Sequence, residues 1–117
     1  MAPAFCFARR WELVTGAEAM AEWRRTGWTS VYHYGEGRQC RLSYRLIEDG
    51  LKYEDFPDVS QPTLIFHGTG DTVVPVSLSG QFVRGRKQAR LVRLDSGHEL
   101  TDQMDGMWRD TAAFLGC

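Results

Sequence analysis

The second half of the chain alternates between short apolar runs and polar, glycine-containing loops, which predicts strands joined by helices. Thr63–Phe66 is apolar and β-branched with no polar alternation, the pattern of a parallel strand that is covered on both faces. Ala89–Leu94 predicts a second strand, and Leu78 and Phe82 mark a helix between the two. This order of elements predicts a right-handed parallel βαβ crossover.

The last predicted element is a helix that follows the second strand. Thr101 can cap its N-terminus. Mainly apolar residues recur at helical spacing on one face: Met104, Met107, Trp108, Thr111 and Leu115. Residues 61–117 are therefore expected to form a βαβα core.

The first half of the chain predicts a helix, a hairpin and a second helix. Thr15–Arg25 has helical composition. The alternation in Trp28–Tyr34, followed by a glycine-rich turn and the return of Arg38–Leu42, predicts a β-hairpin. A further helix is predicted over Ser43–Tyr53, with a serine in the capping position.

The best internal boundary is Glu54–Ser60, which is polar and interrupted by proline. A chain of 117 residues is long enough for one domain and too short for two. The part before the boundary has too few apolar residues to fold alone. We therefore expect a single domain over residues 1–117, with regions 1–60 and 61–117.

Charge and hydropathy exclude several classes of partner. The net charge is −1, and the 14 basic residues are scattered among 15 acidic ones without forming a stripe, so a nucleic acid partner is not expected. No apolar run approaches the ~20 residues of a membrane helix. Met1–Phe7 lacks the basic start and long apolar stretch of a signal peptide. We expect no membrane association and a cytoplasmic location.

Neither the cysteines nor the glycines predict a metal or a cofactor. Cys6, Cys40 and Cys117 are odd in number and widely spaced, which favours three reduced thiols over a disulfide framework or a zinc site. Gly68-Thr-Gly70 follows a strand but lacks the third glycine and the helix start of a dinucleotide site. We therefore expect no cofactor.

Two residues with acid–base chemistry, Asp71 and His98, each follow a predicted strand. A carboxylate that accepts a hydrogen bond from one imidazole nitrogen fixes the tautomer and leaves the other nitrogen free to take a proton from a serine hydroxyl. If Asp71 and His98 form such a pair, their nearest atoms should lie within roughly 3.5 Å. The alternative is that Asp71 is only a turn residue and His98 a surface or capping residue.

Short motifs surround Asp71 and His98. Gly68–Pro75 follows the pattern Gly-x-x-Asp-x-x-Val-Pro, Pro62 opens the strand before it, and Gly97 precedes His98. Gln61–Leu115 therefore resembles the C-terminal portion of the α/β-hydrolases, in which the acid and base follow the nucleophile along the chain. The matching residues are Pro62, Leu64–Phe66, His67, Gly68, Asp71, Val74, Pro75, Gly97 and His98.

Earlier segments extend the resemblance to small bacterial esterase-like proteins of the YqiA/YcfP type. These segments are Ala2–Phe5, Trp11, Glu18–Thr26, His33–Gly35 and Leu42–Tyr44. The resemblance implies an α/β fold: the C-terminal part of an α/β-hydrolase, with a parallel βαβ unit and a final helix. It also makes residues 1–60 a cap-like helix–hairpin–helix segment.

The nucleophile that such a hydrolase requires is not in this sequence. The family places its serine in a Gly-x-Ser-x-Gly elbow and builds the oxyanion hole beside it. No serine of the chain has glycines at both flanking positions of that elbow: Ser30, Ser43, Ser60, Ser77, Ser79 and Ser96. We therefore expect a C-terminal fragment of a serine hydrolase that acts on a small carboxylic ester once a nucleophile-bearing N-terminal half completes it. The isolated chain should be inactive.

The alternative function is a non-catalytic remnant or interaction module that pairs through an exposed sheet edge. Two parallel strands with their helices cannot cover all the apolar faces of a full sheet, so exposed apolar area and possible self-association are expected.

Other candidate side chains have weaker support. His67 could join Asp71 and His98 as a metal ligand, but the strand-end position accounts for it without a metal. The aromatic residues of the first half could line an acyl pocket or form a small core: Trp11, Trp23, Trp28, Tyr32 and Tyr34.

Overall fold

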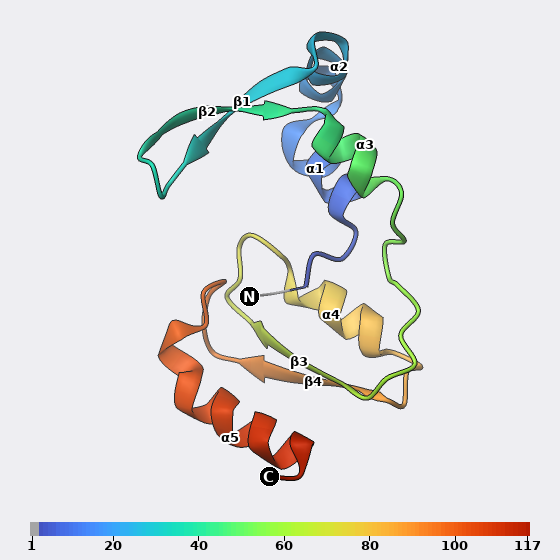
Figure 1. Cartoon of the computed structure of the whole chain (residues 1–117), viewed down its shortest axis with the longest axis vertical. Coiled ribbons are helices and arrows are strands. Elements are labelled where there is room, and N and C mark those ends of the chain that lie inside the picture. The colour runs from blue at the N-terminus through green and yellow to red at the C-terminus, as the bar shows by residue number, and fades with distance from the viewer. Residues whose placement is uncertain (1–2) are drawn as a thin grey trace. The chain divides into compact units, whose positions relative to one another are not determined.

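The computed structural model describes residues 3–117, which form five α-helices, one short 3-10 helix and two separate two-stranded sheets (Figure 1). These elements group into two compact units. Residues 6–57 form one, called here the hairpin unit, and residues 58–117 with the segment ending at Phe5 form the other, called the parallel unit. The division after Pro57 falls inside the predicted boundary Glu54–Ser60. That the whole chain acts as a single domain stays a prediction.

The parallel unit contains the predicted βαβ arrangement. Strands β3 (Thr63–Gly68) and β4 (Ala89–Leu94) pair in parallel along their whole length, and helix α4 (Val76–Val83) connects them. Within the described residues each strand has only the other as a partner. Phe82 of α4 is buried and stacks on Phe5, with ring centroids 4.6 Å apart. The parallel pair is confirmed.

The final helix is preceded by a turn that the sequence did not predict. A 3-10 helix, η1 (Thr101–Gln103), leads into α5 (Met104–Leu115), which ends at Gly116 in the left-handed conformation. No side chain caps either helix, so the predicted capping role of Thr101 is wrong. Leu100 takes the position before η1 instead, with φ of 58° and a buried side chain. A buried leucine, and not a threonine cap, therefore precedes η1.

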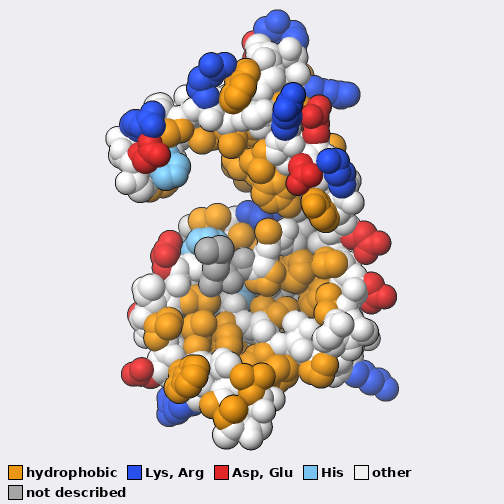
Figure 2. Space-filling model, in the orientation of Figure 1, with side chains coloured by type: hydrophobic (Ala, Val, Ile, Leu, Met, Phe, Trp, Pro, Cys, Tyr) orange, Lys and Arg blue, Asp and Glu red, His pale blue; other side chains and the backbone are white. Residues whose placement is uncertain are grey.

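Helix α5 contacts β3, and the two strands run between α4 and α5 in Figure 1. None of the α5 side chains is fully buried. Four large apolar side chains of α5 are exposed: Met104, Trp108, Phe114 and Leu115. Hydrophobic side chains also gather on the visible face of the parallel unit (Figure 2). The expected exposed apolar area is therefore confirmed.

The hairpin unit contains α1 (Phe7–Thr15), α2 (Ala17–Thr26), β1 (Trp28–His33), β2 (Arg38–Ser43) and α3 (Arg45–Gly50). Strands β1 and β2 are antiparallel, which confirms the predicted hairpin. The predicted helix over Thr15–Arg25 is α2, which begins after Gly16. Helix α1 was not predicted, and Gly16 separates the two helices with φ of 85°, a conformation that favours glycine.

The core of the hairpin unit is built around Trp23, which is 1% exposed. It packs with Met20 and Ile47, and its indole Nε1 donates to the Leu42 carbonyl at 3.1 Å. Trp11 of α1 packs edge to face against Trp23, with ring centroids 5.5 Å apart.

The predicted helix over Ser43–Tyr53 is shorter than expected and covers Arg45–Gly50. The Ser43 hydroxyl accepts a hydrogen bond from the Arg45 amide at 3.3 Å.

The helices and the cysteines bear on two further expectations. Within residues 3–117, no helix has the length and apolar character needed to cross a membrane. The three cysteines, Cys6, Cys40 and Cys117, are free thiols.

Candidate functional site

Asp71 is held in the loop that leaves β3. Its amide donates to the Gly68 carbonyl at 3.2 Å, which closes a turn directly after the strand. One carboxylate oxygen, Oδ1, accepts hydrogen bonds from the amides of Val73 and Val74, both at 2.8 Å. The carboxylate side chain is only 1% exposed. The loop therefore fixes one carboxylate oxygen and leaves Oδ2 for other partners.

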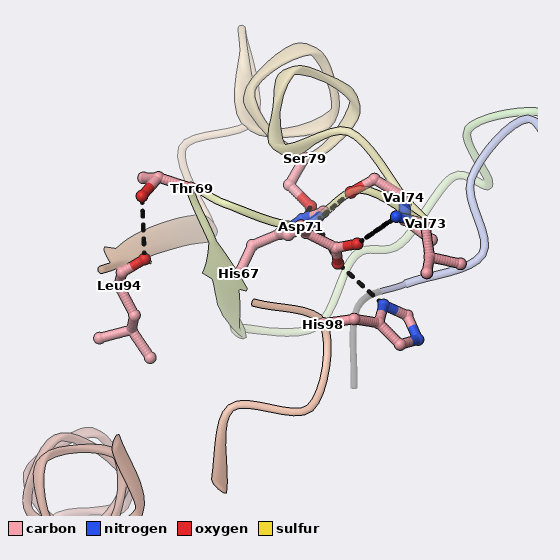
Figure 3. A network of polar contacts seen from close by, with 8 residues as sticks. All are labelled: His67, Thr69, Asp71, Val73, Val74, Ser79, Leu94 and His98. Atoms are coloured by element: carbon pink, nitrogen blue, oxygen red, sulfur yellow. Dashed lines mark hydrogen bonds and ion pairs between the residues drawn. The ribbon is translucent and has the colours of Figure 1, made fainter. Parts of the chain in front are cut away.

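His98 is that other partner, and it comes from the loop that leaves β4. Its Nδ1 lies 2.9 Å from Asp71 Oδ2 (Figure 3). An ionised carboxylate can only accept, so His98 Nδ1 carries the proton and Nε2 is the unprotonated nitrogen of the neutral ring. Nε2 makes no hydrogen bond to any residue of the described range, and the side chain is 27% exposed. The expected proximity of Asp71 and His98 is confirmed, while their catalytic role stays a prediction.

The electrostatics of Asp71 favour its charged form. Burial by itself raises the pKa of this carboxyl, but the hydrogen bonds from the Val74 amide, from His98 and from the Val73 amide outweigh it. The net result is a pKa below the ordinary value of 3.8. Asp71 is therefore ionised at neutral pH and can stabilise a positive charge on the imidazole.

Close packing of the two loops brings the acid and the base together. A Cβ atom on Gly68 would lie 2.3 Å from the carbonyl oxygens of both Ser96 and Gly97, closer than any real Cβ contact. The Gly70 amide donates to the same Ser96 carbonyl at 3.0 Å, and the Thr69 amide donates to Leu94 at 2.8 Å. Only glycine at position 68 allows this approach, because the contact is with backbone atoms.

His67 lies beside the pair and is completely buried, with 0% exposure. Its Nδ1 lies 2.7 Å from the Ser79 hydroxyl, and its Nε2 lies 2.8 Å from the Val74 carbonyl (Figure 3). Nε2 is also 3.3 Å from Asp71 Oδ2. Both ring nitrogens are thus engaged within the protein, and the described residues contain no cluster of His, Cys, Asp and Glu side chains that could hold a metal ion.

Sequence reasoning missed several members of this network. Ser79 was not singled out, although it is fully buried against His67. The Val73 amide was missed as well. Its signal was the Gly-x-x-Asp-x-x-Val-Pro spacing, which places amides two and three residues after the aspartate. A buried serine in a short helix has no comparable sequence signal.

Ser79, His67 and Asp71 form a Ser–His–Asp series, but it is not a nucleophilic site. Ser79 has 0% exposure, so no ester can reach its hydroxyl. Its proton also goes to a histidine whose other nitrogen donates to a backbone carbonyl. Of the two imidazoles in the site, only that of His98 is partly exposed.

The predicted aromatic residues divide into two sets. Trp11 and Trp23 belong to the core of the hairpin unit, which favours their structural interpretation. Trp28, Tyr32 and Tyr34 are exposed. A groove of about 640 Å³ in the same unit is lined by Arg24, Gly27, Trp28, Ser43, Tyr44, Arg45 and Glu48, and it contains neither Asp71 nor His98.

Comparisons of the chain with protein-family models, with curated proteins and with solved structures found no match. The resemblance to α/β-hydrolases therefore stays a prediction from the sequence motifs.

Proposed function

We propose that this chain supplies the acid and the base of a serine hydrolase that cleaves small carboxylic esters in the cytoplasm. Asp71 is the orienting acid, His98 is the general base, and the serine comes from a second polypeptide segment. The fold we propose is the C-terminal part of an α/β-hydrolase. The observation that carries this proposal is the 2.9 Å contact between His98 Nδ1 and the buried Asp71 carboxylate, which leaves His98 Nε2 partly exposed.

This geometry suits proton transfer at Nε2. In the proposed reaction His98 Nε2 takes the proton of the serine hydroxyl as the serine oxygen attacks the ester carbonyl. The imidazolium that forms is stabilised by the Asp71 carboxylate and returns its proton to the leaving alcohol. Water then hydrolyses the acyl-serine by the same route, which regenerates the serine and the neutral imidazole. The oxyanion would be stabilised by backbone amides of the serine-bearing segment.

Hydrolysis of a short-chain nitrophenyl ester tests the proposal. The chain alone should act no faster than free imidazole at equal concentration, because a serine and an oxyanion hole are both required for triad chemistry. Addition of a segment with a Gly-x-Ser-x-Gly elbow should restore saturable turnover. His98→Ala should abolish that turnover, whereas His33→Ala, which changes an exposed histidine of the hairpin unit, should leave it intact.

Reactivity of the chain alone gives an independent measurement. Diethyl pyrocarbonate acylates unprotonated imidazole nitrogens, so the partly exposed His98 should react while the buried His67 should not. Saturable hydrolysis by the chain alone that survives His98→Ala would mean that another site is at work, and the assignment would be wrong.

A second candidate function is an interaction module that pairs through a sheet edge. The observation that favours it is that β3 and β4 each have a single strand partner within the described residues, while large apolar side chains of α5 are exposed. Sedimentation velocity distinguishes the two functions. Association that is unchanged by His98→Ala, in a chain that no elbow-bearing segment activates, supports the interaction module.

A further inference from the structure

Two sets of hydrogen bonds, joined through the backbone of Val74, lead from helix α4 to the partly exposed imidazole of His98. The Val74 carbonyl can only accept, so His67 Nε2 carries a proton and donates it there at 2.8 Å. In the neutral ring His67 Nδ1 is then an acceptor, and the Ser79 hydroxyl donates to it at 2.7 Å. The Val74 amide donates to Asp71 Oδ1, and His98 Nδ1 donates to Asp71 Oδ2.

Three hydrogen bonds hold the Asp71 carboxylate, and His67 Nε2 lies close to it. An ionised carboxylate offers about four lone-pair directions. The amides of Val73 and Val74 occupy Oδ1, while His98 donates to Oδ2 and His67 Nε2 stands 3.3 Å from the same atom. Rotation of the carboxylate would break one of these contacts in a site that is closed to water, where an unpaired polar group is costly.

His67 contacts this arrangement at two points. His67 Nε2 donates to the Val74 carbonyl, and the amide of Val74 donates to Asp71 Oδ1. His67 also stands directly against Oδ2. Because Ser79 fixes the ring of His67, a helix, a strand end and a loop are joined at one fully buried imidazole.

We propose that His67, held by Ser79, is a positioning residue that orients the Asp71 carboxylate toward His98 and thereby fixes the proton of His98 on Nδ1. The role of His67 in catalysis rests on the proposed function. His67 itself touches no substrate. The two histidines carry their protons on opposite nitrogens, His67 on Nε2 and His98 on Nδ1, and this pattern can be observed.

The test is nitrogen-15 NMR of the imidazole side chains in the full 117-residue chain, at a pH where both rings are neutral. The wild-type chain should show His67 protonated on Nε2 and His98 protonated on Nδ1. Ser79→Ala removes one oxygen atom and the donor to His67. The ratio of the Nδ1-protonated to the Nε2-protonated form of His98 should then fall on the order of fivefold, the effect of one net hydrogen bond.

Two more variants complete the experiment. His67→Gln keeps a side-chain donor but loses the imidazole, and the His98 ratio should fall at least as far as in Ser79→Ala. Ser77→Ala is the matched control, because Ser77 is an exposed serine of the same helix. It should leave both histidine patterns unchanged.

A merely structural role for His67 predicts a different result. Thermal stability would then fall in Ser79→Ala and His67→Gln while the His98 protonation pattern stayed as in the wild type, and this would overturn the proposal. Loss of the folded amide spectrum in Ser79→Ala would overturn it as well, because the network would then maintain the fold and not the orientation. The measurement needs no nucleophile, so its outcome is separate from the hydrolysis test above.

Discussion

The imidazole of His98 donates through Nδ1 to Asp71 Oδ2 at 2.9 Å, although the two residues are 27 positions apart in the chain. The carboxylate is 1% exposed and the imidazole 27%. The buried carboxylate of Asp71 therefore binds Nδ1 of His98, while Nε2 of the same ring points away from the carboxylate (Figure 3). This arrangement is compatible with the general-base role proposed for His98 Nε2.

The lowered pKa of Asp71 predicts a pH dependence of stability. The folded-state pKa lies below the unfolded value of about 3.9, so the carboxylate stabilises the fold fully above that pH. This stabilisation is lost as the pH falls through the lower folded-state pKa. Asp71→Asn should lower the free energy of unfolding at neutral pH by about 1–3 kcal/mol, because the amide cannot accept from both amides and from His98.

Urea unfolding at neutral pH and at about pH 3 checks this prediction, because the difference between wild type and Asp71→Asn should shrink in acid. Asp95→Asn, at an exposed aspartate of the same unit, is the control and should change the neutral-pH stability by less than about 0.5 kcal/mol. A constant difference between wild type and Asp71→Asn at both pH values would contradict the prediction.

The close approach of the two loops predicts that Gly68 cannot be replaced. Gly68→Ala should destabilise the chain by about 1–3 kcal/mol or more, because its methyl group would overlap the carbonyl oxygens of Ser96 and Gly97. His98 should lose its contact with Asp71 in the same variant, visible as a change in its NMR protonation pattern. Chemical denaturation measures the stability.

Gly106→Ala is the matched control for that substitution. A Cβ atom at Gly106 would meet no atom within 4 Å, and the residue lies inside α5. Alanine there should stabilise the chain by about 0.5–1 kcal/mol, because glycine is a poor helix former. Equal stability of Gly68→Ala and Gly106→Ala would show that the packing around Gly68 is looser than in the structure.

Two tryptophans of the hairpin unit should respond differently to truncation. Trp23→Ala should cost about 3–5 kcal/mol, because the indole is 1% exposed and forms the core with Met20 and Ile47. Trp28→Ala should cost far less, since that side chain is 47% exposed. Thermal unfolding followed by circular dichroism compares the two variants, and equal losses would show that Trp23 is not central to the core.

The exposed apolar side chains of α5 predict self-association and binding of a hydrophobic dye. Trp108 is 73% exposed, so Trp108→Gln should reduce both without lowering the melting temperature. Arg109→Gln changes the neighbouring exposed residue and serves as the control. A wild-type chain that stays monomeric by sedimentation and binds no dye would contradict this prediction.

Local patterns in the sequence accounted for the strands whose apolar run or alternation can be recognised along the chain itself. The apolar run Thr63–Phe66 predicted β3, and the alternation in Trp28–Tyr34 predicted the hairpin. They failed for α1, since its aromatic face becomes meaningful only when Trp11 meets Trp23. They failed also at Thr101, which lies inside η1, while the buried Leu100 takes the position before it.

The sequence by itself determined that Asp71 and His98 follow two strands, because the strands, glycines and loops around them are local signals with fixed spacing. The order of the elements also predicted parallel pairing of β3 and β4. Only the tertiary structure decided how closely the two loops pack and which atoms of Asp71 and His98 meet. It alone decided that His67 and Ser79 are buried against each other. The physical reason is that a buried polar group is specified by whichever partners surround it in space, and those partners lie 7 to 27 residues apart in this chain.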